Sequence, residues 1–578
     1  MNSVQKLLTD HIDIWTDADT EKKSGRGRIS GNAASVYGIR KLRELILDLA
    51  MRGKLIEQDQ NDEPPYDALK KTKHWPLKED KNSGHIPDSW ISVPLEVLAA
   101  DTKYPIGDGD HGQINPACYT DLGVPYIRVA DLGWGTFEPN GLVHIPESVH
   151  EQNLKSELRP GDILIAKTGA TIGKCCIVPA SIPRANTTSS VGKVTVNQGL
   201  VLPKWIICYF LSGGFKEKMW AVSKKTAQPG FNIINLKNFV VPVPSIAEQH
   251  RIVAKVDELM ALCDQLETRH NNAAEAHEKL LSLLLATLTQ SQNAADFSAN
   301  WQRIAAHFDT LFSTEASIDA LKQTLLQLAV MGKLVPQDPN DEPASALLKR
   351  IQAEKTRLVA EGKIKKDKPL SPIADDEMPF ALPRGWEWAR LQSVIDVRDG
   401  THDSPKEAGG LDAYPLVTSK DFFEGRINFD TARRISEADY LKISKRSLVE
   451  KYDILFSMIG GNIGNQVLVN DDRPFSIKNV ALFKYYDKNL TFPFFIKKYM
   501  EDLAVNLQAT AVGGAQPFVA LGALRNLVMA LPPLAEQHRI VAKVDELMAL
   551  CDQLKTRITE ANQLQQKLAD VVVEQAIA

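Results

Sequence analysis

Two short segments resemble parts of enzyme active sites, but each lacks a residue on which the chemistry depends. Glu63-Pro-Pro-Tyr66 is close to the Asp/Asn-Pro-Pro-Tyr signature of amino-methyltransferases, yet its first residue is wrong and no Gly-rich cofactor loop follows a strand upstream of it. The segment Gly169-Ala-Thr-Ile-Gly-Lys174 resembles the end of a nucleotide-binding P-loop. It is one residue short, however, and Cys175 replaces the hydroxyl residue that binds magnesium. We interpret this second segment as a tight turn between strands that can bring backbone amides near a phosphate group.

The histidines and cysteines show no spacing typical of a metal site. The 12 histidines form no His-x-x-x-His pair, and the 6 cysteines show no paired metal-ligand spacing. His250 and His538 each lie in the first turn of a repeated helix, where we interpret them as structural. No cluster of carboxylates with a lysine and no Ser/His/Asp arrangement can be assigned. The sequence therefore predicts no catalytic residue, no metal ligand and no cofactor within this chain.

Side chains that could contact nucleic acid occur in two long segments, residues 87–244 and 383–532. Arg and Lys bind phosphates and guanine edges, Asn and Gln bind adenine, and Ser and Thr bind either. The first segment has 14 basic and 13 acidic residues and the second has 19 and 18, so a binding face must be a local patch. In the first segment the candidates are Arg128, Lys167, Thr168, Lys174, Arg184, Asn186, Lys224, Lys225 and Gln228. In the second they are Thr418, Lys420, Arg426, Arg433, Arg434, Lys445, Arg446, Lys478, Asn479 and Gln516.

A letter-for-letter repeat indicates which elements hold these two segments. Residues 247–266 return as residues 535–554, an offset of 288 residues. In both copies apolar residues recur at alternating steps of four and three, which is the seam of a long helix packed lengthwise against another helix. The predicted seam residues are Ile252, Val256, Leu259, Cys263 and Leu266 in the first copy and Ile540, Val544, Leu547, Cys551 and Leu554 in the second.

The repeat extends beyond the long helix. A shorter amphipathic helix is predicted over residues 39–53 and again over residues 318–332, each ending at a glycine. Each copy continues into a charged, lysine-rich linker and a Pro-x-x-Trp segment, at Trp90 and at Trp386. Short β-rich runs with Gly and Pro then indicate two mixed α/β globules of divergent sequence. A shared scaffold with unlike globules indicates one docking surface used twice and two different readers.

Length and composition set wide limits. A chain of 578 residues predicts three to five domains, and 44% hydrophobic with 24% charged residues is ordinary for a globular protein. The formal net charge of -4 argues against a histone-like basic protein without excluding DNA binding through local patches. There is no apolar stretch of signal length at the amino terminus and no run of about 18 apolar residues that could span a bilayer. Unpaired cysteines favour the reducing cytoplasm.

The arrangement resembles the specificity (S) subunit of type I restriction-modification systems. The likeness lies in the Ala-Glu-Gln-x-Arg-Ile-Val helix starts at residues 247 and 535, the two Pro-x-x-Trp segments and the Gly-Asp-Ile-Leu strands, in the second of which Tyr452 replaces the glycine. It spans residues 35–578, and the helical region before the first globule resembles the type IB branch. The implied fold class is α+β, with two α/β target recognition domains separated by a long antiparallel coiled coil and related by a pseudo-two-fold internal repeat.

The repeat divides the chain into six predicted segments. They are a polar tail (1–33), an N-terminal helical conserved region (34–86), target recognition domain 1 (87–244), a central conserved helical region (245–382), target recognition domain 2 (383–532) and a C-terminal conserved helix (533–578).

The resemblance implies a DNA-sequence reader with no catalytic activity of its own. Each globule would read one half of an asymmetric, split target in double-stranded DNA. The helices would dock two methyltransferase subunits, which the restriction (motor-nuclease) subunits join. Adenine N6 methylation, ATP-dependent cleavage and the cofactors S-adenosylmethionine, ATP and magnesium would belong to those partners, in a cytoplasmic system of phage defence.

Two alternative functions stay open. One is a self-contained DNA methyltransferase with fused recognition domains, which would bind S-adenosylmethionine without any partner. The other is a coiled-coil scaffold whose globules bind protein or carbohydrate, which would give no bipartite footprint on DNA.

Overall fold

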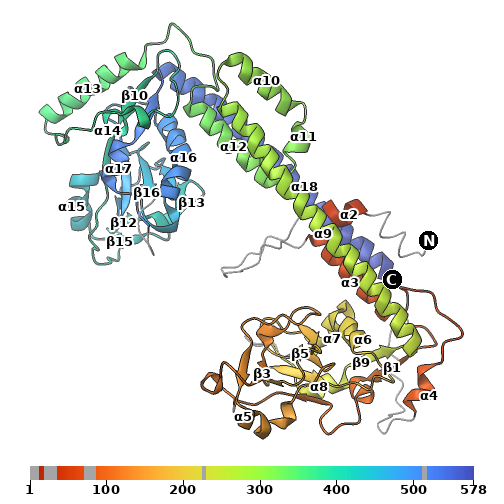
Figure 1. Cartoon of the computed structure of the whole chain (residues 1–578). Helices are drawn as coiled ribbons and strands as arrows, with labels where there is room; N and C mark the ends of the chain where they lie inside the picture. Colours follow the sequence, from red (N-terminus) through yellow and green to blue (C-terminus); the bar gives the residue numbers. More distant parts are fainter. Residues whose placement is uncertain are drawn as a thin grey trace. The chain divides into compact units, whose positions relative to one another are not determined.

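The computed structural model describes residues 12–17, 36–70, 86–112, 114–223, 229–410, 412–510 and 517–577. The chain divides into two compact units, residues 1–274 with 560–578, and residues 275–559. Both cuts fall inside a long helix, α9 (Ile246–Thr289) or α18 (Leu534–Ile577) (Figure 1). Each unit therefore holds one globule together with the first part of one long helix and the last part of the other.

The first globule is built on two small sheets. The larger has the strand order β2-β8-β5-β6, and the smaller has the order β4-β3-β7 with a parallel β3–β7 pair. Helix α6 packs against β5 and β6. Strand β5 is buried at all four positions, which explains its continuous apolar sequence. The strands are β1 (Ile91–Pro94), β2 (Ile106–Asp108), β3 (Val124–Ile127), β4 (Val143–Ile145), β5 (Ile163–Ala166), β6 (Cys175–Ile177), β7 (Asn186–Thr187), β8 (Val191–Val194) and β9 (Val240–Val243). The helices are α5 (Glu147–Gln152), α6 (Pro203–Leu211), α7 (Gly213–Val222) and α8 (Ile233–Asn238).

The second globule repeats this topology. Its larger sheet has the order β11-β19-β16-β17, its smaller sheet has the order β15-β12-β18, and the β12–β18 pair is again parallel. A β13–β14 hairpin is added to this frame. The strands are β10 (Glu387–Arg390), β11 (Asp396–Asp399), β12 (Tyr414–Val417), β13 (Phe422–Phe423), β14 (Arg426–Ile427), β15 (Arg433–Ile435), β16 (Ile454–Ser457), β17 (Gln466–Leu468), β18 (Ser476–Ile477), β19 (Val480–Lys484) and β20 (Val528–Leu531). The helices are α14 (Leu391–Val394), α15 (Glu437–Ser447), α16 (Pro493–Thr510) and α17 (Leu521–Asn526).

One departure from the repeat changes a side chain but preserves the turn. Gly161, two residues before β5, has a φ of 87°, and Tyr452 holds the same place before β16 with a φ of 72°. This left-handed conformation costs a non-glycine residue about 1–2 kcal/mol. The Tyr452 ring gains a contact with the Phe494 ring, with a 6.0 Å separation of centroids, which offsets part of that cost.

The repeated Gly-Asp-Ile-Leu motif begins each central strand with a buried aspartate. Asp162 accepts a hydrogen bond of 2.5 Å from Thr195 Oγ1, and Asp453 lies 2.7 Å from Lys484 Nζ. Burial raises the pKa of both carboxyls, and these polar partners only partly oppose the shift. The motif therefore supports the start of the strand from inside the globule.

Each globule is joined to its long helix by the same set of contacts. In the first unit, β1 pairs with β9 at the base of the globule, and Glu248 at the start of α9 accepts from Trp90 Nε1 at 3.0 Å and from Gln58 Nε2 at 2.6 Å. In the second unit, β10 pairs with β20, and Glu536 accepts from Trp386 Nε1 at 3.0 Å and from Gln337 Nε2 at 3.1 Å. The Pro-x-x-Trp segments and the Ala-Glu-Gln helix starts are therefore two sides of one joint, which explains why both recur in the sequence.

A second repeated pair of charges completes this joint. Arg251 on α9 lies 2.7 Å from Asp62, and Arg539 on α18 lies 2.6 Å from Asp341. Each aspartate belongs to the loop that follows the short helix, so the short helix, the globule and the long helix all meet at this point.

In each unit a short helix packs against parts of both long helices. In the first unit, Arg43 on α3 (Tyr37–Met51) lies 2.8 Å from Asp264 on α9, and Tyr37 donates to Asp570 on α18 at 2.7 Å. In the second unit, Lys322 on α12 (Glu315–Val330) lies 2.5 Å from Asp552 on α18. The beginning of one long helix thus shares a unit with the end of the other, as an antiparallel pair requires. The remaining helices of these regions are α4 (Pro65–Leu69), α10 (Ala294–Ala305), α11 (Phe308–Leu311) and α13 (Ala344–Ala360).

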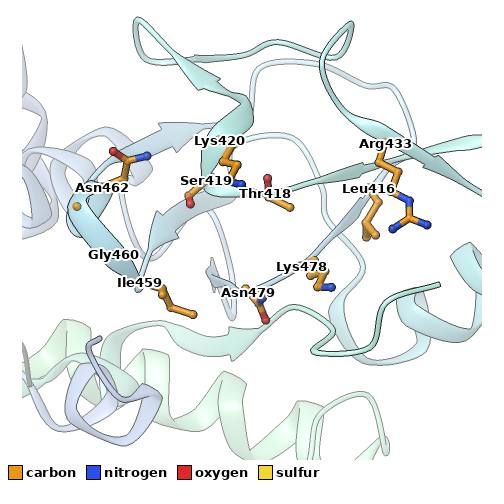
Figure 2. Close-up of a pocket in the computed structure, with 11 residues that line it drawn as sticks. Leu416, Thr418, Ser419, Lys420, Arg433, Ile459, Gly460, Asn462, Lys478 and Asn479 are labelled. Carbon is orange, nitrogen blue, oxygen red and sulfur yellow. The ribbon is translucent and has the colours of Figure 1, made fainter. Parts of the chain in front are cut away.

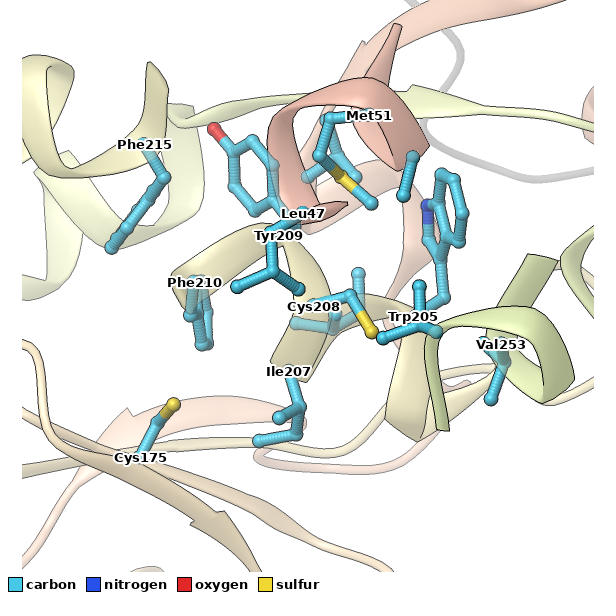
Figure 3. Close-up of a cluster of buried hydrophobic side chains, with 14 of the residues drawn as sticks. Leu47, Met51, Cys175, Trp205, Ile207, Cys208, Tyr209, Phe210, Phe215 and Val253 are labelled. Atoms are coloured by element: carbon cyan, nitrogen blue, oxygen red, sulfur yellow. The ribbon is translucent and has the colours of Figure 1, made fainter. Parts of the chain in front are cut away.

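The predicted seam positions lie at the hydrophobic contacts of these helices. Seven of the ten are at most 3% exposed, and the other three, Leu266, Leu547 and Leu554, are half-buried. Below α3 the core continues into the first globule, where Met51 and Leu47 meet Trp205 and Tyr209 of α6 (Figure 3). The short helix α3 is therefore packed against the globule as well as against the long helix α9.

The predicted polar tail is wrong at residues 12–17, which form α2 (Ile12–Asp17). Trp15 is fully buried against α3, and a Cβ on Gly38 would lie 2.5 Å from the Trp15 carbonyl oxygen. A single large aromatic side chain is enough to anchor this otherwise polar turn. The rest of the predicted tail, and the first lysine-rich linker after Lys70, lie outside the described residues.

One buried carboxyl predicts a pH effect on the stability of the second unit. Burial raises the pKa of Asp502 on α16 to about 6, although Gln323 on α12 donates a hydrogen bond of 3.1 Å to it. Because the folded pKa lies above the unfolded value, stability falls as pH rises from about 4 to about 6 and then stays low.

We therefore expect Asp502→Asn, which keeps the acceptor for Gln323, to raise the Tm by a few degrees at pH 7.5 and to have little effect at pH 4.5. Thermal unfolding of both proteins at the two pH values measures this. Glu501→Gln is the matched control, because the Glu501 carboxylate is paired with Lys497 and should give no gain. An equal gain at both pH values would contradict the assignment.

Candidate nucleic-acid interface

A concave site in the second globule gathers side chains from four separate parts of the sequence. It has a volume of about 500 Å³ and lies where β12, β15 and β18 end near the turn after β16 (Figure 2). Five of the predicted DNA-binding residues line it, namely Thr418, Lys420, Arg433, Lys478 and Asn479. Leu416, Ser419, Ile459, Gly460, Gly461 and Asn462 complete the lining.

The charge of this site is one-sided. Its lining contains three cationic side chains, from Lys420, Arg433 and Lys478, and no acidic residue. Arg433 is exposed and its nearest carboxylate, Glu407, is 3.9 Å away, so the guanidinium is only weakly paired. Lys420 is exposed as well. Such a cavity favours an anionic ligand, and its size and mixture of charged and amide groups suit a phosphate with an adjoining base edge.

The backbone supports these side chains. Thr418 donates from both its amide and its hydroxyl to Asp421 Oδ2, at 2.8 and 2.9 Å, which holds the turn that presents Lys420. Asn479 has a φ of 56°, and its side-chain oxygen lies 3.0 Å from the Nδ1 atom of His402. Gly460 has a φ of 74°, so the turn after β16 brings unshielded backbone to the cavity wall.

The other predicted residues of the second globule lie outside this lining. Arg434 donates to the backbone carbonyl of Ala413, at 2.6 Å from one guanidinium nitrogen, which makes it a support of β12. Arg446 on α15 pairs with Asp399 at the end of β11. Arg426 and Lys445 are exposed. Gln516 lies outside the described residues.

In the first globule two of the predicted contact residues lie in the interior. Asn186 is fully buried in β7, where its amide donates to the carbonyl of Asn153 at 3.1 Å. Lys167 is 5% exposed and ends 2.5 Å from Asp108. Both side chains are satisfied inside the domain, Asn186 by His150 and Asn153 and Lys167 by Asp108 at the end of β2.

Four further candidates of the first globule, all within the described residues, are at least partly accessible. Arg128, which follows β3 as Thr418 follows β12, donates to the carbonyl of Gly141 at 2.8 Å and stays partly exposed. Thr168 is exposed and Lys174 is half-buried. Arg184 is exposed and forms two hydrogen bonds with Glu147, at 2.7 and 2.6 Å. Lys224, Lys225 and Gln228 lie outside the described residues.

The P-loop-like segment forms the tight turn predicted for it. It connects β5 to β6, and Gly169 and Gly173 have φ values of 95° and 90°. The corresponding turn of the second globule, between β16 and β17, carries Gly460 and Gly464 with φ values of 74° and 88°. This is the turn that lines the cavity of the second globule.

Sequence reasoning missed one histidine in each globule. His111 Nε2 lies 3.2 Å from Asp108 at the end of β2, and His402 Nε2 lies 3.0 Å from Asp399 at the end of β11. Both belong to an Asp-Gly-x-His turn at residues 108–111 and 399–402. A search for short identities between the two globules would have found this signal, since spacing rules for metal ligands do not detect it.

Within the described residues, no group of three or more His, Cys, Asp or Glu side chains is placed to hold a metal ion. No helix in the same part of the chain is long and apolar enough to cross a membrane.

Burial raises the pKa of Cys176 to about 12 and also raises the pKa of its neighbour Cys175, so both thiols stay protonated in the core.

Comparison with known proteins places these features in a family. A family model described as the type I restriction modification DNA specificity domain matches residues 120–276 and 383–565. The specificity subunit of the type I restriction enzyme EcoAI from Escherichia coli is 36% identical over 609 aligned residues, and that of EcoEI from Escherichia coli is 35% identical over 628. Both alignments cover 100% of this chain and 100% of the relative. A solved structure reported for complex assembly and conformational transition of the type I R-M system is 19% identical, covers 85% of this chain and 98% of the other, and has a TM-score of 0.48.

Proposed function

The chain belongs to the type I restriction-modification DNA specificity family, and we propose that it is the sequence-reading, non-catalytic subunit of such a complex. In this proposal its two globules bind the two halves of an asymmetric bipartite target in double-stranded DNA. Its helices dock two methyltransferase subunits, which the restriction subunits join. S-adenosylmethionine, ATP and magnesium are the cofactors of those partner subunits, and this chain binds none of them.

The observation that carries the proposal is that the two globules share one backbone topology but present different side chains at matching positions. The cavity positions Thr418, Lys478 and Asn479 of the second globule correspond to Arg128, Thr188 and Ser189 of the first, because the flanking strands have the same register. Because the two globules have the same topology, we expect corresponding loops to face the DNA in both. Their different side chains would then recognise different base edges. Two different half-sites follow from this difference.

The long helices can set the distance between the half-sites. Each contains 44 residues, which corresponds to about 66 Å at 1.5 Å per residue. One turn of B-DNA is about 34 Å, so a rod of this length is compatible with two readers bound a turn or more apart.

A repeated apolar surface supports the docking of one partner twice. Leu262 on α9 and Leu550 on α18 occupy matching positions of the repeat and are 45% and 50% exposed. Further along the helices, exposed Leu280 and Leu283 of α9 match exposed Leu568 and Val571 of α18 at the same offset of 288 residues. Exposed apolar side chains that recur at equal places in both units are typical of a protein interface.

Removing charge from the cavity tests the DNA-reading role. We expect the triple variant Lys420→Ala, Arg433→Ala, Lys478→Ala to bind the target about a hundredfold more weakly, because each such contact contributes about 1–3 kcal/mol when it touches a base edge and less at a phosphate. Fluorescence anisotropy of the assembled complex with target DNA measures the loss. Sequencing of methylated sites should show relaxed recognition in one half-site only.

The matched control removes three exposed charges of the same unit far from the cavity lining, with Lys349→Ala, Lys365→Ala and Lys366→Ala. This variant should bind almost as the unmodified complex does. Equal losses in the two triple variants would show that net charge, and not the cavity, determines binding. Relaxation of both half-sites would contradict independent readers.

A further inference from the structure

The two globules share an Asp-Gly-x-His turn, at residues 108–111 and 399–402. Each copy follows the edge strand of the larger sheet, β2 or β11, and is held by a strand of the smaller sheet, β7 or β18. Asp110 N donates to the carbonyl of Thr187 at 3.0 Å, and Thr401 N donates to the carbonyl of Ile477 at 2.9 Å. In the second globule the turn also borders the cationic cavity, through the contact between His402 and Asn479.

Packing explains two of the three shared residues. A Cβ on Gly109 or Gly400 would overlap the carbonyl of the neighbouring strand, so only glycine fits there. The aspartates are largely buried and hold a cation from another element of the globule. The histidine side chains are 75% exposed at His111 and 61% exposed at His402, so neither contributes much to the core. Their recurrence needs another reason.

In the first globule the charged groups around the His111 imidazole leave its Nδ1 atom available for a ligand. Asp108 lies between Lys167, from the end of β5, and His111 Nε2. Asp110 is turned toward the amides of Gly112 and Ile114, at 3.0 and 2.8 Å. Among the described residues, His111 Nδ1 has no hydrogen-bond partner.

The second globule builds the same aspartate–imidazole pair from different residues, but here the other ring nitrogen, His402 Nδ1, lies 3.0 Å from Asn479 Oδ1. Asp399 lies between Arg446, from α15, and His402 Nε2. Asp403, next to the ring in sequence, is 3.7 Å from Lys442 of α15, and Lys478 follows β18 beside Asn479. The cation that shares the aspartate thus differs between the globules, whereas the aspartate–imidazole pair is kept.

We propose that the histidine of each turn binds a DNA backbone phosphate as an imidazolium, with the aspartate on Nε2 and the phosphate on Nδ1, where the phosphate replaces Asn479 Oδ1 in the second globule. A group retained in two readers of unlike sequence does not explain how their targets differ, whereas a phosphate is present at every position of DNA. Two anions on opposite sides of the ring stabilise its protonated form. DNA binding therefore takes up a proton at each turn. This inference rests on the DNA-reading function proposed above.

The variants His111→Gln and His402→Gln, singly and together, test the proposal in the assembled complex. Glutamine can still donate a hydrogen bond but cannot become a cation. At pH 6 each single variant should bind target DNA about fivefold to tenfold more weakly. Between pH 6 and pH 8 at constant ionic strength, the affinity of the unmodified complex should fall. Each single variant should lose about half of this slope and the double variant nearly all of it.

A backbone scan identifies the contacted group. In the unmodified complex, replacing single phosphates by uncharged methylphosphonates should reveal one position in each half-site where affinity falls. The penalty at that position should disappear in the variant of the corresponding histidine and persist in the other variant, as a double-mutant cycle requires. The methylated sequence should be the same in all four complexes.

Three results would overturn the inference: a changed target sequence, an unchanged pH slope, or methylphosphonate penalties that persist in both variants. Each is separable from failure of the proposed function. If the unmodified complex binds a bipartite target and the histidine variants bind equally well, only the phosphate contact is wrong. If the unmodified complex binds no such target, the DNA-reading function itself is wrong.

Discussion

Replacing residues 90–244 with the corresponding globule of another family member should change one half of the DNA target and leave the other half as it was. The cut is structurally favourable because β1 and β9 pair at the base of the globule, with Ile91 opposite Val243, so both ends of the cassette leave at one place. The donor must supply a tryptophan at position 90, since Glu248 of the retained helix accepts its hydrogen bond.

The expected effect of this exchange is large. Each mismatched base pair costs about 1–3 kcal/mol, so three changed positions would weaken binding to the original target by about a thousandfold or more. Sequencing of methylated sites in cells carrying the exchanged system measures the outcome directly. The reciprocal exchange of residues 387–531, which lie between the paired strands β10 and β20, should change the other half alone. Loss of both halves after either exchange would mean that the globules do not read independently.

Leu262→Glu and Leu550→Glu should each remove one methyltransferase subunit from the complex, and the double variant should remove both. A carboxylate introduced among buried apolar side chains at an interface must be desolvated without a partner. Binding at that position should therefore weaken by about a hundredfold or more. Both leucines are about half exposed in this chain, so the substitutions should leave its own folding intact.

Native mass spectrometry of the purified complexes tests this prediction by counting subunits. The matched controls are Leu262→Met and Leu550→Met, which keep the apolar area and should retain two partners. Two partners in the double Glu variant would place the docking surface elsewhere on the helices. Loss of both partners in a single variant would show that the two docking events are coupled and not separate.

The joint at the start of each long helix connects the globule, whose exchange should change the target, to the helix whose leucines we expect to bind a partner. Glu248 and Glu536 are buried, which raises the pKa of both carboxyls, and each binds a tryptophan of its globule and a glutamine that follows its short helix. In each unit the orientation of the globule is therefore tied to the long helix on which we propose that a partner docks.

Much of the fold follows from the sequence because its signals are local or repeated. The seam from Ile252 to Leu266 is legible as steps of four and three, since helical periodicity places those residues on one face whatever the rest of the chain does. The repeat at an offset of 288 residues shows that the architecture is doubled. The incomplete motifs at Tyr66 and Lys174 argued against a methyltransferase site and a nucleotide-binding P-loop at these positions. These conclusions needed no contact between distant residues.

The site depended on tertiary structure, because exposure of a polar side chain is set by segments far away in the sequence. Asn186 and Lys167 have the right chemistry for DNA, yet both are buried and bind Asn153 and Asp108 of their own globule. The cavity of the second globule joins residues as far apart as Leu416 and Asn479, and the joint pairs Trp90 with Glu248. The sequence by itself determined that there are two readers on a duplicated helical scaffold. Only the tertiary structure decided which side chains they present, since burial and hydrogen bonding between distant strands leave some donors free and satisfy others.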